Sequence, residues 1–183
     1  MEFTAGTSQC LSEAQFVGLG QYRHKVFVET LGWDVPTRAG LELDQFDRPD
    51  TIYVLARNHG KLVGVARLLP TLRPYLLDEV FPHLMGDARP PKSAEVWELS
   101  RFAAVGCQSR VPSGHLSTTA LELLRAVQDC ALRQGASRLI MVTALGVERL
   151  LRNAGYCVYR AGPPQVVDGQ PVLACWIELQ PSK

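Results

Sequence analysis

The order of sequence patterns predicts an α+β fold in which a mixed central sheet is flanked by helices. Two β-rich runs separated by a turn indicate a hairpin, and an amphipathic helix between two further strand-like runs indicates a crossover. A hairpin joins antiparallel strands and a crossover helix joins parallel ones, so one sheet should contain both pairings. No repeat or domain boundary interrupts the order, which predicts a single domain over residues 1–183.

The first helix is predicted within residues 11–30. Ser12 and Gln15 have the spacing of a capping box, and apolar side chains follow at helical intervals. Glycines in the middle of the segment weaken it, so it can form one helix or two short ones. Residues 31–50 are polar and rich in turn formers, and we expect an ordered loop there.

The hairpin consists of Thr51–Ala56 and Leu62–Leu69, joined by Asn58-His59-Gly60. The proline-rich residues 70–94 are expected to cross the surface with one short helix. The rest of the chain predicts a buried strand, a long amphipathic helix, a strand, a short helix and two closing strands: Val96–Val105, His115–Gly135, Ser137–Ala144, Val147–Asn153, Tyr156–Arg160 and Val172–Leu179.

Composition excludes several classes of protein. Apolar residues make up 46% and charged residues 20%, as in soluble globular chains. No run approaches the roughly 20 apolar residues of a membrane span, and no secretory signal is visible, so we expect a cytoplasmic protein. The net charge of +1 predicts no nucleic-acid partner. The net charge is −3 over residues 1–98 and +4 over residues 99–183. This uneven distribution is either scatter or a match to two differently charged substrates.

Metal and disulfide chemistry is not indicated. The five cysteines are scattered without a CxxC motif, and the four histidines lack ligand spacing. We therefore expect reduced thiols and no metal site. No glycine-rich phosphate loop, GxSxG or HExxH motif occurs.

Two clusters of polar and aromatic residues lie in the first 50 residues. Arg23 and Phe27 are one helical turn apart with Trp33 just beyond, although aromatic residues at this spacing are commonly core. Asp44 and Asp47 place two carboxylates in an apolar-studded loop, where solvated or capping groups are the ordinary interpretation.

A third cluster lies within the predicted strand Val96–Val105. Glu98 and Ser100 share one face of the strand, with Arg101 on the other unless a bulge intervenes. Charged residues within a central strand are costly unless they are paired or functional. Pairing of Glu98 with Arg67, from the neighbouring hairpin, is the structural alternative to a functional role.

Together these clusters resemble the acyl-homoserine lactone synthase (autoinducer synthase) family. The family signature has eight positions, and each finds a match: Arg23, Phe27, Trp33, Asp44, Asp47, Arg67, Glu98 and Arg101. The resemblance implies an N-acetyltransferase-like fold in which Val96–Val105 and Ser137–Ala144 splay apart around a phosphopantetheine arm. It also implies an enzyme that acylates the amine of S-adenosylmethionine and closes a lactone ring, releasing methylthioadenosine. The product is a quorum-sensing signal, and no cofactor is needed because S-adenosylmethionine is a substrate.

The resemblance implies roles for individual residues. Trp33 with Asp44 and Asp47 suits a sulfonium, and Arg23 or Arg101 suits the substrate carboxylate. The residues expected to contact S-adenosylmethionine are Arg23, Phe27, Trp33, Asp44, Asp47, Arg101 and Phe102. Glu98, acting through a water, is the candidate general base, with Arg101 as a further catalytic residue; a backbone carbonyl and water could share the role of base. Arg67 and Ser100 are expected to shape the cleft, and Phe102, Met141 and Thr143 to line the acyl pocket.

The acyl donor is expected to be an acyl-carrier protein or an acyl-CoA. An acidic carrier protein could meet Arg149 and Arg152, although for each arginine alone a solvated helix face is the slightly favoured explanation. No obligatory protein partner is inferred. Two rival functions remain: a coenzyme A-dependent N-acetyltransferase, which lacks its glycine loop because Arg101 is followed by Phe102-Ala103-Ala104-Val105, and a non-catalytic ligand-binding regulator.

Overall fold

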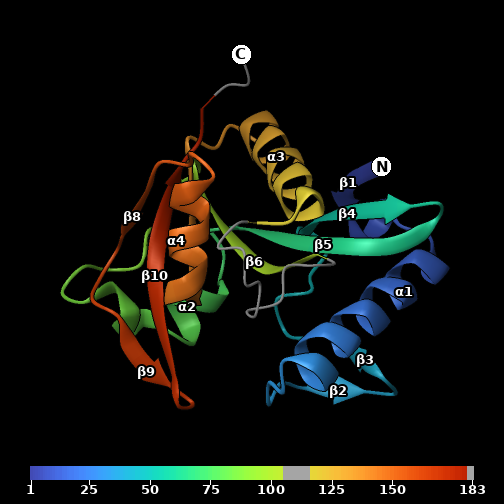
Figure 1. Ribbon diagram of the computed structural model, residues 1–183, viewed down its shortest axis with the longest axis horizontal. Helices are drawn as coiled ribbons and strands as arrows, with labels where there is room; N and C mark the ends of the chain where they lie inside the picture. The colour runs from blue at the N-terminus through green and yellow to red at the C-terminus, as the bar shows by residue number, and fades with distance from the viewer. Residues whose placement is uncertain (105–115, 181–183) are drawn as a thin grey trace.

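In the computed structural model, which describes residues 1–104 and 116–180, the chain folds around one sheet (Figure 1). Seven strands follow the order β1-β4-β5-β6-β7-β10-β8, and an eighth, β9, pairs with β10. The strands are β1 (Glu2–Thr7), β4 (Ile52–Asn58), β5 (Lys61–Pro70), β6 (Val96–Ala104), β7 (Arg138–Ala144), β8 (Val158–Arg160), β9 (Gln165–Val167) and β10 (Gln170–Glu178). Neighbours are antiparallel except β6 and β7, which are parallel. The predicted mixed sheet is confirmed.

Helices cover both faces of the sheet (Figure 1). One face carries α3 (Thr118–Arg133) and α4 (Leu145–Asn153). The other face carries the remaining helical segments and a two-stranded ribbon: η1 (Ser8–Cys10), α1 (Glu13–Arg23), the π-helix η2 (His24–Thr30), β2 (Thr37–Arg38), β3 (Leu41–Glu42), α2 (Leu76–Glu79) and the 3-10 helix η3 (Pro82–Met85). The sheet is therefore buried on both sides.

Strand β4 illustrates how the sequence divides between the two cores. Ile52, Val54 and Ala56 pack towards α3, whereas Tyr53 and Leu55 pack towards α1. Successive side chains of a strand point to opposite faces, so a strand with helices on both sides must be apolar at nearly every position. All five of these residues are buried.

Several local predictions are confirmed. Ser12 and Gln15 form the capping box, with Ser12 Oγ accepting from the Gln15 N–H at 3.3 Å. The first helical segment divides after Arg23, where the chain changes from an α-helix to a π-helix. At the β4–β5 turn, His59 and Gly60 have φ of 48° and 75°, the left-handed conformation that such a turn requires.

Other predictions need correction. β1 and β9 were not predicted. Glu2–Thr7 is largely exposed, and Phe3 and Ala5 are its only apolar side chains, which is too short a pattern to indicate a strand. The ribbon β2–β3 lies in the segment expected to be a loop. α4 begins at Leu145, two residues before the predicted start, and β8 begins at Val158. Val105, His115 and Cys107 lie outside the described residues.

A bulge in β6 determines which side chains reach the α1 side of the sheet. Ser100 lies opposite Arg67, but the next pair of partners is Ala103 with Val65. The extra residue reverses the face of Arg101, which has φ of 49°. Arg101 therefore lies on the same face of the sheet as Ser100. Without a bulge, the alternation of the strand would have put the two side chains on opposite faces.

The parallel pairing of β6 with β7 is short. It joins Val96–Glu98 to Arg138–Ile140, and no later pair forms between the described residues of the two strands. Glu98 is the last residue of β6 that pairs with β7. Beyond Glu98, β6 pairs only with β5 among the described residues, so the backbone groups on its other edge have no strand partner there.

Candidate active site

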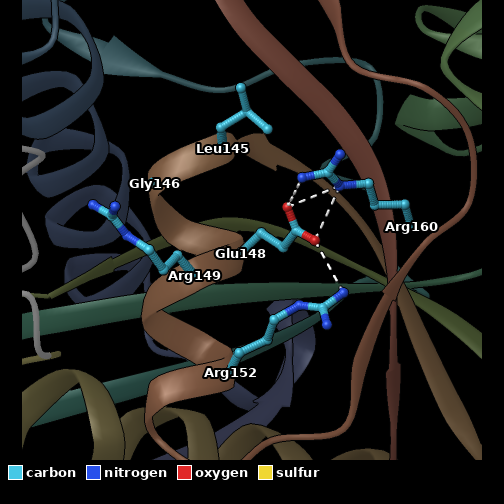
Figure 2. Close-up of a pocket in the computed structure, with 6 residues that line it drawn as sticks. All are labelled: Leu145, Gly146, Glu148, Arg149, Arg152 and Arg160. Carbon is cyan, nitrogen blue, oxygen red and sulfur yellow. Dashed lines mark hydrogen bonds and ion pairs between the residues drawn. The ribbon is translucent and has the colours of Figure 1, made fainter.

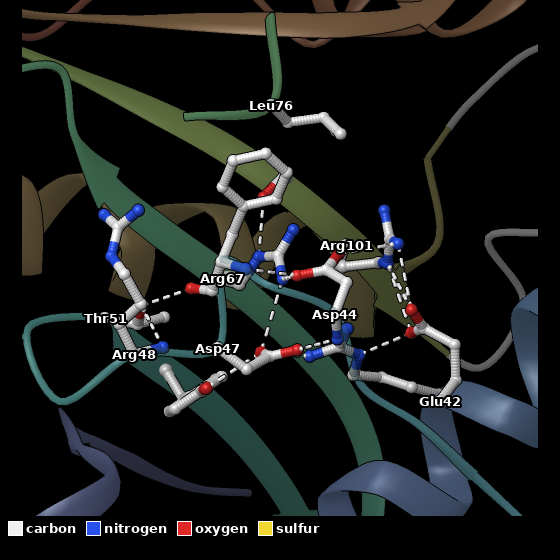
Figure 3. A network of polar contacts seen from close by, with 12 residues as sticks. Glu42, Asp44, Asp47, Arg48, Thr51, Arg67, Leu76 and Arg101 are labelled. Carbon is white, nitrogen blue, oxygen red and sulfur yellow. Dashed lines mark hydrogen bonds and ion pairs between the residues drawn. The ribbon is translucent and has the colours of Figure 1, made fainter. Parts of the chain in front are cut away.

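Three arginines and three carboxylates form a closed network on the α1 side of the sheet (Figure 3). They come from α1, β3, the loop after it, β5 and β6: Arg23, Glu42, Asp44, Asp47, Arg67 and Arg101. Their side chains are at most 6% exposed. Buried ions are tolerated only when they are paired and hydrogen-bonded, and here the charges balance three against three.

The loop after β3 is folded by its own aspartates. Asp44 Oδ1 accepts the N–H of Phe46 at 2.9 Å, and Asp47 Oδ2 accepts the N–H of Asp44 at 2.7 Å. Such turns are typical of aspartate, whose short side chain reaches nearby backbone groups. Phe46 is buried in the core that includes Leu69 of β5 and Ile140 of β7. The other two carboxylate oxygens, Asp44 Oδ2 and Asp47 Oδ1, accept from Arg101 and Arg23.

Asp47 connects Arg23 to Arg67. Its Oδ1 lies 2.6 Å from Arg23 Nη1, 3.3 Å from Arg67 Nη1 and 2.8 Å from the hydroxyl of Tyr53. Burial alone would raise the pKa of Asp47, but the charges of Arg23 and Arg67 outweigh it and lower the pKa to about 2. Asp47 is therefore ionised at any working pH.

Asp44 connects Arg67 to Arg101. Its Oδ1 accepts from Arg67 Nη1 at 2.6 Å, and its Oδ2 accepts from Arg101 Nη2 at 3.0 Å. Arg67 donates through Nε to the hydroxyl of Ser100 at 3.0 Å. Arg67 and Ser100 thus brace the network against β5 and β6.

Glu42 closes the ring and was missed by the sequence analysis. It accepts from Arg23 Nε at 2.6 Å and from Arg101 Nη2 at 2.9 Å, and its side chain is fully buried. Burial opposes ionisation, but hydrogen bonds from Arg23 and Arg101 lower the pKa of Glu42. The sequence spacing could have identified Glu42. It lies two residues before Asp44, so in an extended chain both side chains point to the same face. Three arginines also need a third carboxylate to balance their charge.

Two aromatic rings adjoin the network. Phe27 and Trp33 stack with ring centroids 4.8 Å apart, and the Arg101 guanidinium lies 5.6 Å and 5.9 Å from their centroids. Phe27 is buried, whereas Trp33 is 45% exposed. The predicted cluster of a cation, a phenyl ring and an indole therefore exists, with the indole on its open side.

Two buried donors of the network lack a protein acceptor. Within the described residues, Nη2 of Arg23 and Nη2 of Arg67 are buried and have no hydrogen-bond partner. An unsatisfied buried donor is costly, so such atoms in a charged site indicate where an acceptor on a ligand would bind.

Glu98 does not pair with Arg67, which corrects the structural alternative for this residue. Its fully buried carboxylate accepts the N–H groups of Leu76 and Leu77, at 2.9 Å and 2.8 Å. Burial raises its pKa to about 7, despite the opposing effects of those N–H groups and of Arg67 and Arg101. Glu98 therefore changes charge near neutral pH.

The predicted acyl-pocket residues lie on the opposite face of the sheet from the network. Phe102 and Met141 belong to the core under α3 and α4, and Thr143 lies two residues further along β7 on the same face as Met141. Phe102 and Thr143 are half-buried, and Met141 is 5% exposed. They line the two strands where β6 and β7 stop pairing.

A pocket of about 630 Å³ lies between α4 and β8 (Figure 2). It is lined by Leu145, Gly146, Glu148, Arg149, Arg152 and Arg160. The carboxylate of Glu148 accepts from Arg152 at 3.1 Å and from Arg160 at 2.9 Å, while Arg149 points away from it in Figure 2. Arg152 and Arg160 are about half exposed, at 50% and 47%, so they present positive charge to solvent.

In the described part of the chain, no cluster of three or more histidine, cysteine, aspartate or glutamate side chains is arranged to hold a metal ion. None of its helices is long and apolar enough to cross a membrane.

Comparison with known proteins matches nearly the whole chain. The autoinducer synthase family model matches residues 8–182. An acyl-homoserine-lactone synthase of Ralstonia solanacearum is 47% identical over 175 residues, covering 94% of this chain and 86% of the relative.

Solved structures agree. TofI, in a ternary complex with an inhibitor and MTA, is 46% identical with a TM-score of 0.84, covering 98% of this chain and 92% of TofI. BjaI, a CoA-dependent acyl-homoserine lactone synthase with SAM and isopentyl-CoA, is 29% identical with a TM-score of 0.86, covering 98% and 83%. An acyl-CoA N-acyltransferase from Pseudomonas aeruginosa, 17% identical with a TM-score of 0.65, covers 96% and 97% and shares the fold.

Proposed function

Because this chain belongs to the autoinducer synthase family and is an acyl-homoserine-lactone synthase, we propose that its buried arginine–carboxylate network binds S-adenosylmethionine. The enzyme makes acyl-homoserine lactone signals for quorum sensing from S-adenosylmethionine and an acyl thioester. Its fold is the α+β fold of the acyl-CoA N-acyltransferases. The observation that carries the proposal is the convergence of Arg23, Asp44 and Arg101 with the Phe27–Trp33 pair in one buried cluster.

The reaction makes two bonds. The amine of S-adenosylmethionine attacks the thioester carbonyl, forming the amide and releasing the thiol of the acyl carrier. The methionyl carboxylate then attacks its own γ-carbon, closing the lactone and expelling methylthioadenosine. The second step is intramolecular, so holding the chain folded supplies much of its rate.

The aromatic pair and the arginines are proposed to bind different parts of S-adenosylmethionine. A sulfonium is attracted to the face of an indole and to nearby carboxylates. Trp33 leaves nearly half of its surface open and lies beside the Arg101 guanidinium, which pairs with Asp44. The adenosyl or thioether portion packs on Phe27, whereas Phe102 lies on the opposite face of the sheet and is left to the acyl chain. The substrate carboxylate binds Arg23 or Arg101, and the buried Nη2 of Arg23, which has no partner among the described residues, favours Arg23.

Glu98 is the proposed general base, acting through a water. A free α-amine has a pKa of about 8, and a base is most effective when its own pKa lies near the working pH. The pKa of about 7 for Glu98 meets that condition. Its carboxylate accepts two backbone N–H groups, which leaves acceptor sites for a water. Arg101, three residues after Glu98 in the bulged strand β6, is proposed to act beside it.

The acyl thioester is proposed to enter where β6 and β7 stop pairing. Backbone N–H groups that have no strand partner there among the described residues can stabilise the oxyanion that forms on the thioester carbonyl. Phe102, Met141 and Thr143 line that place on the α3 side and are proposed to hold the acyl chain.

The carrier is proposed to dock at the pocket beside α4. Arg149 and Arg152 point to different sides of α4, and Arg160 joins Arg152 through Glu148 (Figure 2). Such a basic surface would attract an acidic carrier protein or the phosphates of coenzyme A. BjaI is a CoA-dependent relative, so both donors belong in the test.

The proposal is tested by expressing the protein in a bacterium that makes no such signal and analysing the culture extract by mass spectrometry. We expect a lactone that disappears in a strain carrying Glu98→Gln. A lactone of equal abundance in that strain would contradict the role of Glu98. Unchanged yield in Arg23→Ala and Asp44→Asn strains would contradict the role of the network.

A further inference from the structure

We propose that Tyr53 is a positioning residue for the S-adenosylmethionine site, because its hydroxyl fixes the Asp47 carboxylate that joins Arg23 to Arg67. This inference rests on the proposed function of the network. Tyr53 lies outside the eight positions of the family signature.

Tyr53 is anchored in the rigid part of the fold. It lies on β4, between β1 and β5, and is fully buried. Its ring meets Phe16 of α1 edge to face, with centroids 6.0 Å apart, and packs in the core formed with Leu19 and Val65. The hydroxyl emerges from this core and lies 2.8 Å from Asp47 Oδ1.

A phenylalanine would fill the same space, so the hydroxyl needs its own explanation. Burying a hydroxyl is unfavourable unless it is hydrogen-bonded, and here the acceptor is an ionised carboxylate. Burial, together with the neighbouring charge of Asp47, raises the pKa of Tyr53 well above its usual range. The hydroxyl therefore keeps its proton and remains a donor.

The other partners of Asp47 Oδ1 are the hydrogen-bonded Arg23 and the ion-paired Arg67, and they differ from Tyr53 in kind. Arg23 Nη1 at 2.6 Å and Arg67 Nη1 at 3.3 Å come from long side chains that are themselves oriented by carboxylates. Tyr53 approaches on a stiff ring attached to a central strand. The Asp44 N–H fixes Oδ2 of Asp47, and Tyr53 supplies the fixed donor at Oδ1, the oxygen that meets both arginines.

The orientation of these arginines matters because each has a buried Nη2 with no partner among the residues that the structure describes. If Asp47 rotates, Arg23 and Arg67 move with it, and the donors offered to the substrate carboxylate shift. Small misplacements of binding groups are costly. We expect Tyr53→Phe to raise the Michaelis constant for S-adenosylmethionine roughly tenfold, the equivalent of one hydrogen bond to a charged group. The Michaelis constant for the acyl donor should not change.

The experiment compares three variants of the purified enzyme. Tyr53→Phe removes the proposed contact. Tyr75→Phe is the matched control, because Tyr75 is equally buried and its hydroxyl donates to the carbonyl of Pro91 at 2.7 Å, away from the network. Asp47→Asn tests the network itself. Melting temperature, the Michaelis constants for both substrates and calorimetric binding of S-adenosylmethionine are measured for each.

We expect both tyrosine variants to melt at lower temperature, but only Tyr53→Phe and Asp47→Asn to bind S-adenosylmethionine more weakly. If Asp47→Asn weakens binding and Tyr53→Phe stays within twofold of wild type, the positioning role is overturned and the site assignment stands. If neither variant weakens binding, both are overturned. An equal weakening by Tyr75→Phe would make the effect general destabilisation and would also overturn the proposal.

Discussion

Replacing Glu98 with glutamine separates its ability to take a proton from its shape. The side-chain oxygen of glutamine can still accept one of the two N–H groups of Leu76 and Leu77, which Glu98 accepts at 2.9 Å and 2.8 Å. The amide cannot act as a base. General base catalysis contributes roughly 10²- to 10⁴-fold, so we expect the rate of methylthioadenosine release to fall by that factor.

The same substitution has a predicted effect on stability, and its sign follows from the pKa. The pKa of Glu98 is about 7 in the folded protein against a usual value of 4.5, so the folded state binds the proton more tightly. This group therefore stabilises the fold fully below pH 4.5 and loses that contribution as pH rises through 7. The shift corresponds to about 3 kcal/mol.

The assay combines urea unfolding with initial rates of methylthioadenosine release between pH 5 and pH 8.5. Wild type should lose roughly 2 to 3 kcal/mol more stability across this range than Glu98→Gln, because part of the full shift already lies below pH 5. Its rate should show an inflection near pH 7 that the variant lacks. Glu79→Gln, an exposed substitution on α2, is the control and should behave as wild type. A Glu98→Gln enzyme that keeps both the rate and the inflection would refute the assignment.

Three further predictions concern binding and stability. Asp47→Asn should weaken S-adenosylmethionine binding at least tenfold by calorimetry, and unchanged affinity would count against its role. The pKa of Asp47 is about 2 against a usual 3.8, so wild type has about 2 kcal/mol of stability above pH 4 that it loses towards pH 2. The variant should lack that contribution. Trp33→Ala should raise the Michaelis constant for S-adenosylmethionine with little change in melting temperature, since Trp33 is 45% exposed; an unchanged constant would remove the indole from the site. Charge reversal at Arg149 and Arg152 should raise the Michaelis constant for carrier protein alone, and no effect would move the docking surface elsewhere.

Elements whose signals are local could be predicted from the sequence. The capping box at Ser12, the turn at Gly60 and the amphipathic face of α3 each depend on neighbouring residues, and the structure has all three. β1 could not be predicted in the same way. It gains its place by pairing with β4, a contact about 50 residues away in sequence, and its own residues are largely exposed.

The site shows the same division. Pattern and resemblance identified Arg23, Asp44 and Arg101, but not the geometry that brings them together. The bulge depends on Arg101 adopting a φ of 49°, for which arginine has no sequence preference. The partners of Glu98 are backbone N–H groups, and no residue type encodes a backbone donor. The contact between Tyr53 and Asp47 required the folded position of β4 relative to the loop.

The most direct test of the proposed chemistry is the stoichiometry of the products made by the purified protein. It is supplied with S-adenosylmethionine and a panel of acyl-carrier-protein and acyl-CoA thioesters, and free thiol, methylthioadenosine and lactone are measured together. We expect the three products in equal amounts with at least one donor, and no methylthioadenosine without a donor. Thiol release without methylthioadenosine would identify a simple N-acyltransferase and contradict the coupling of acylation to ring closure.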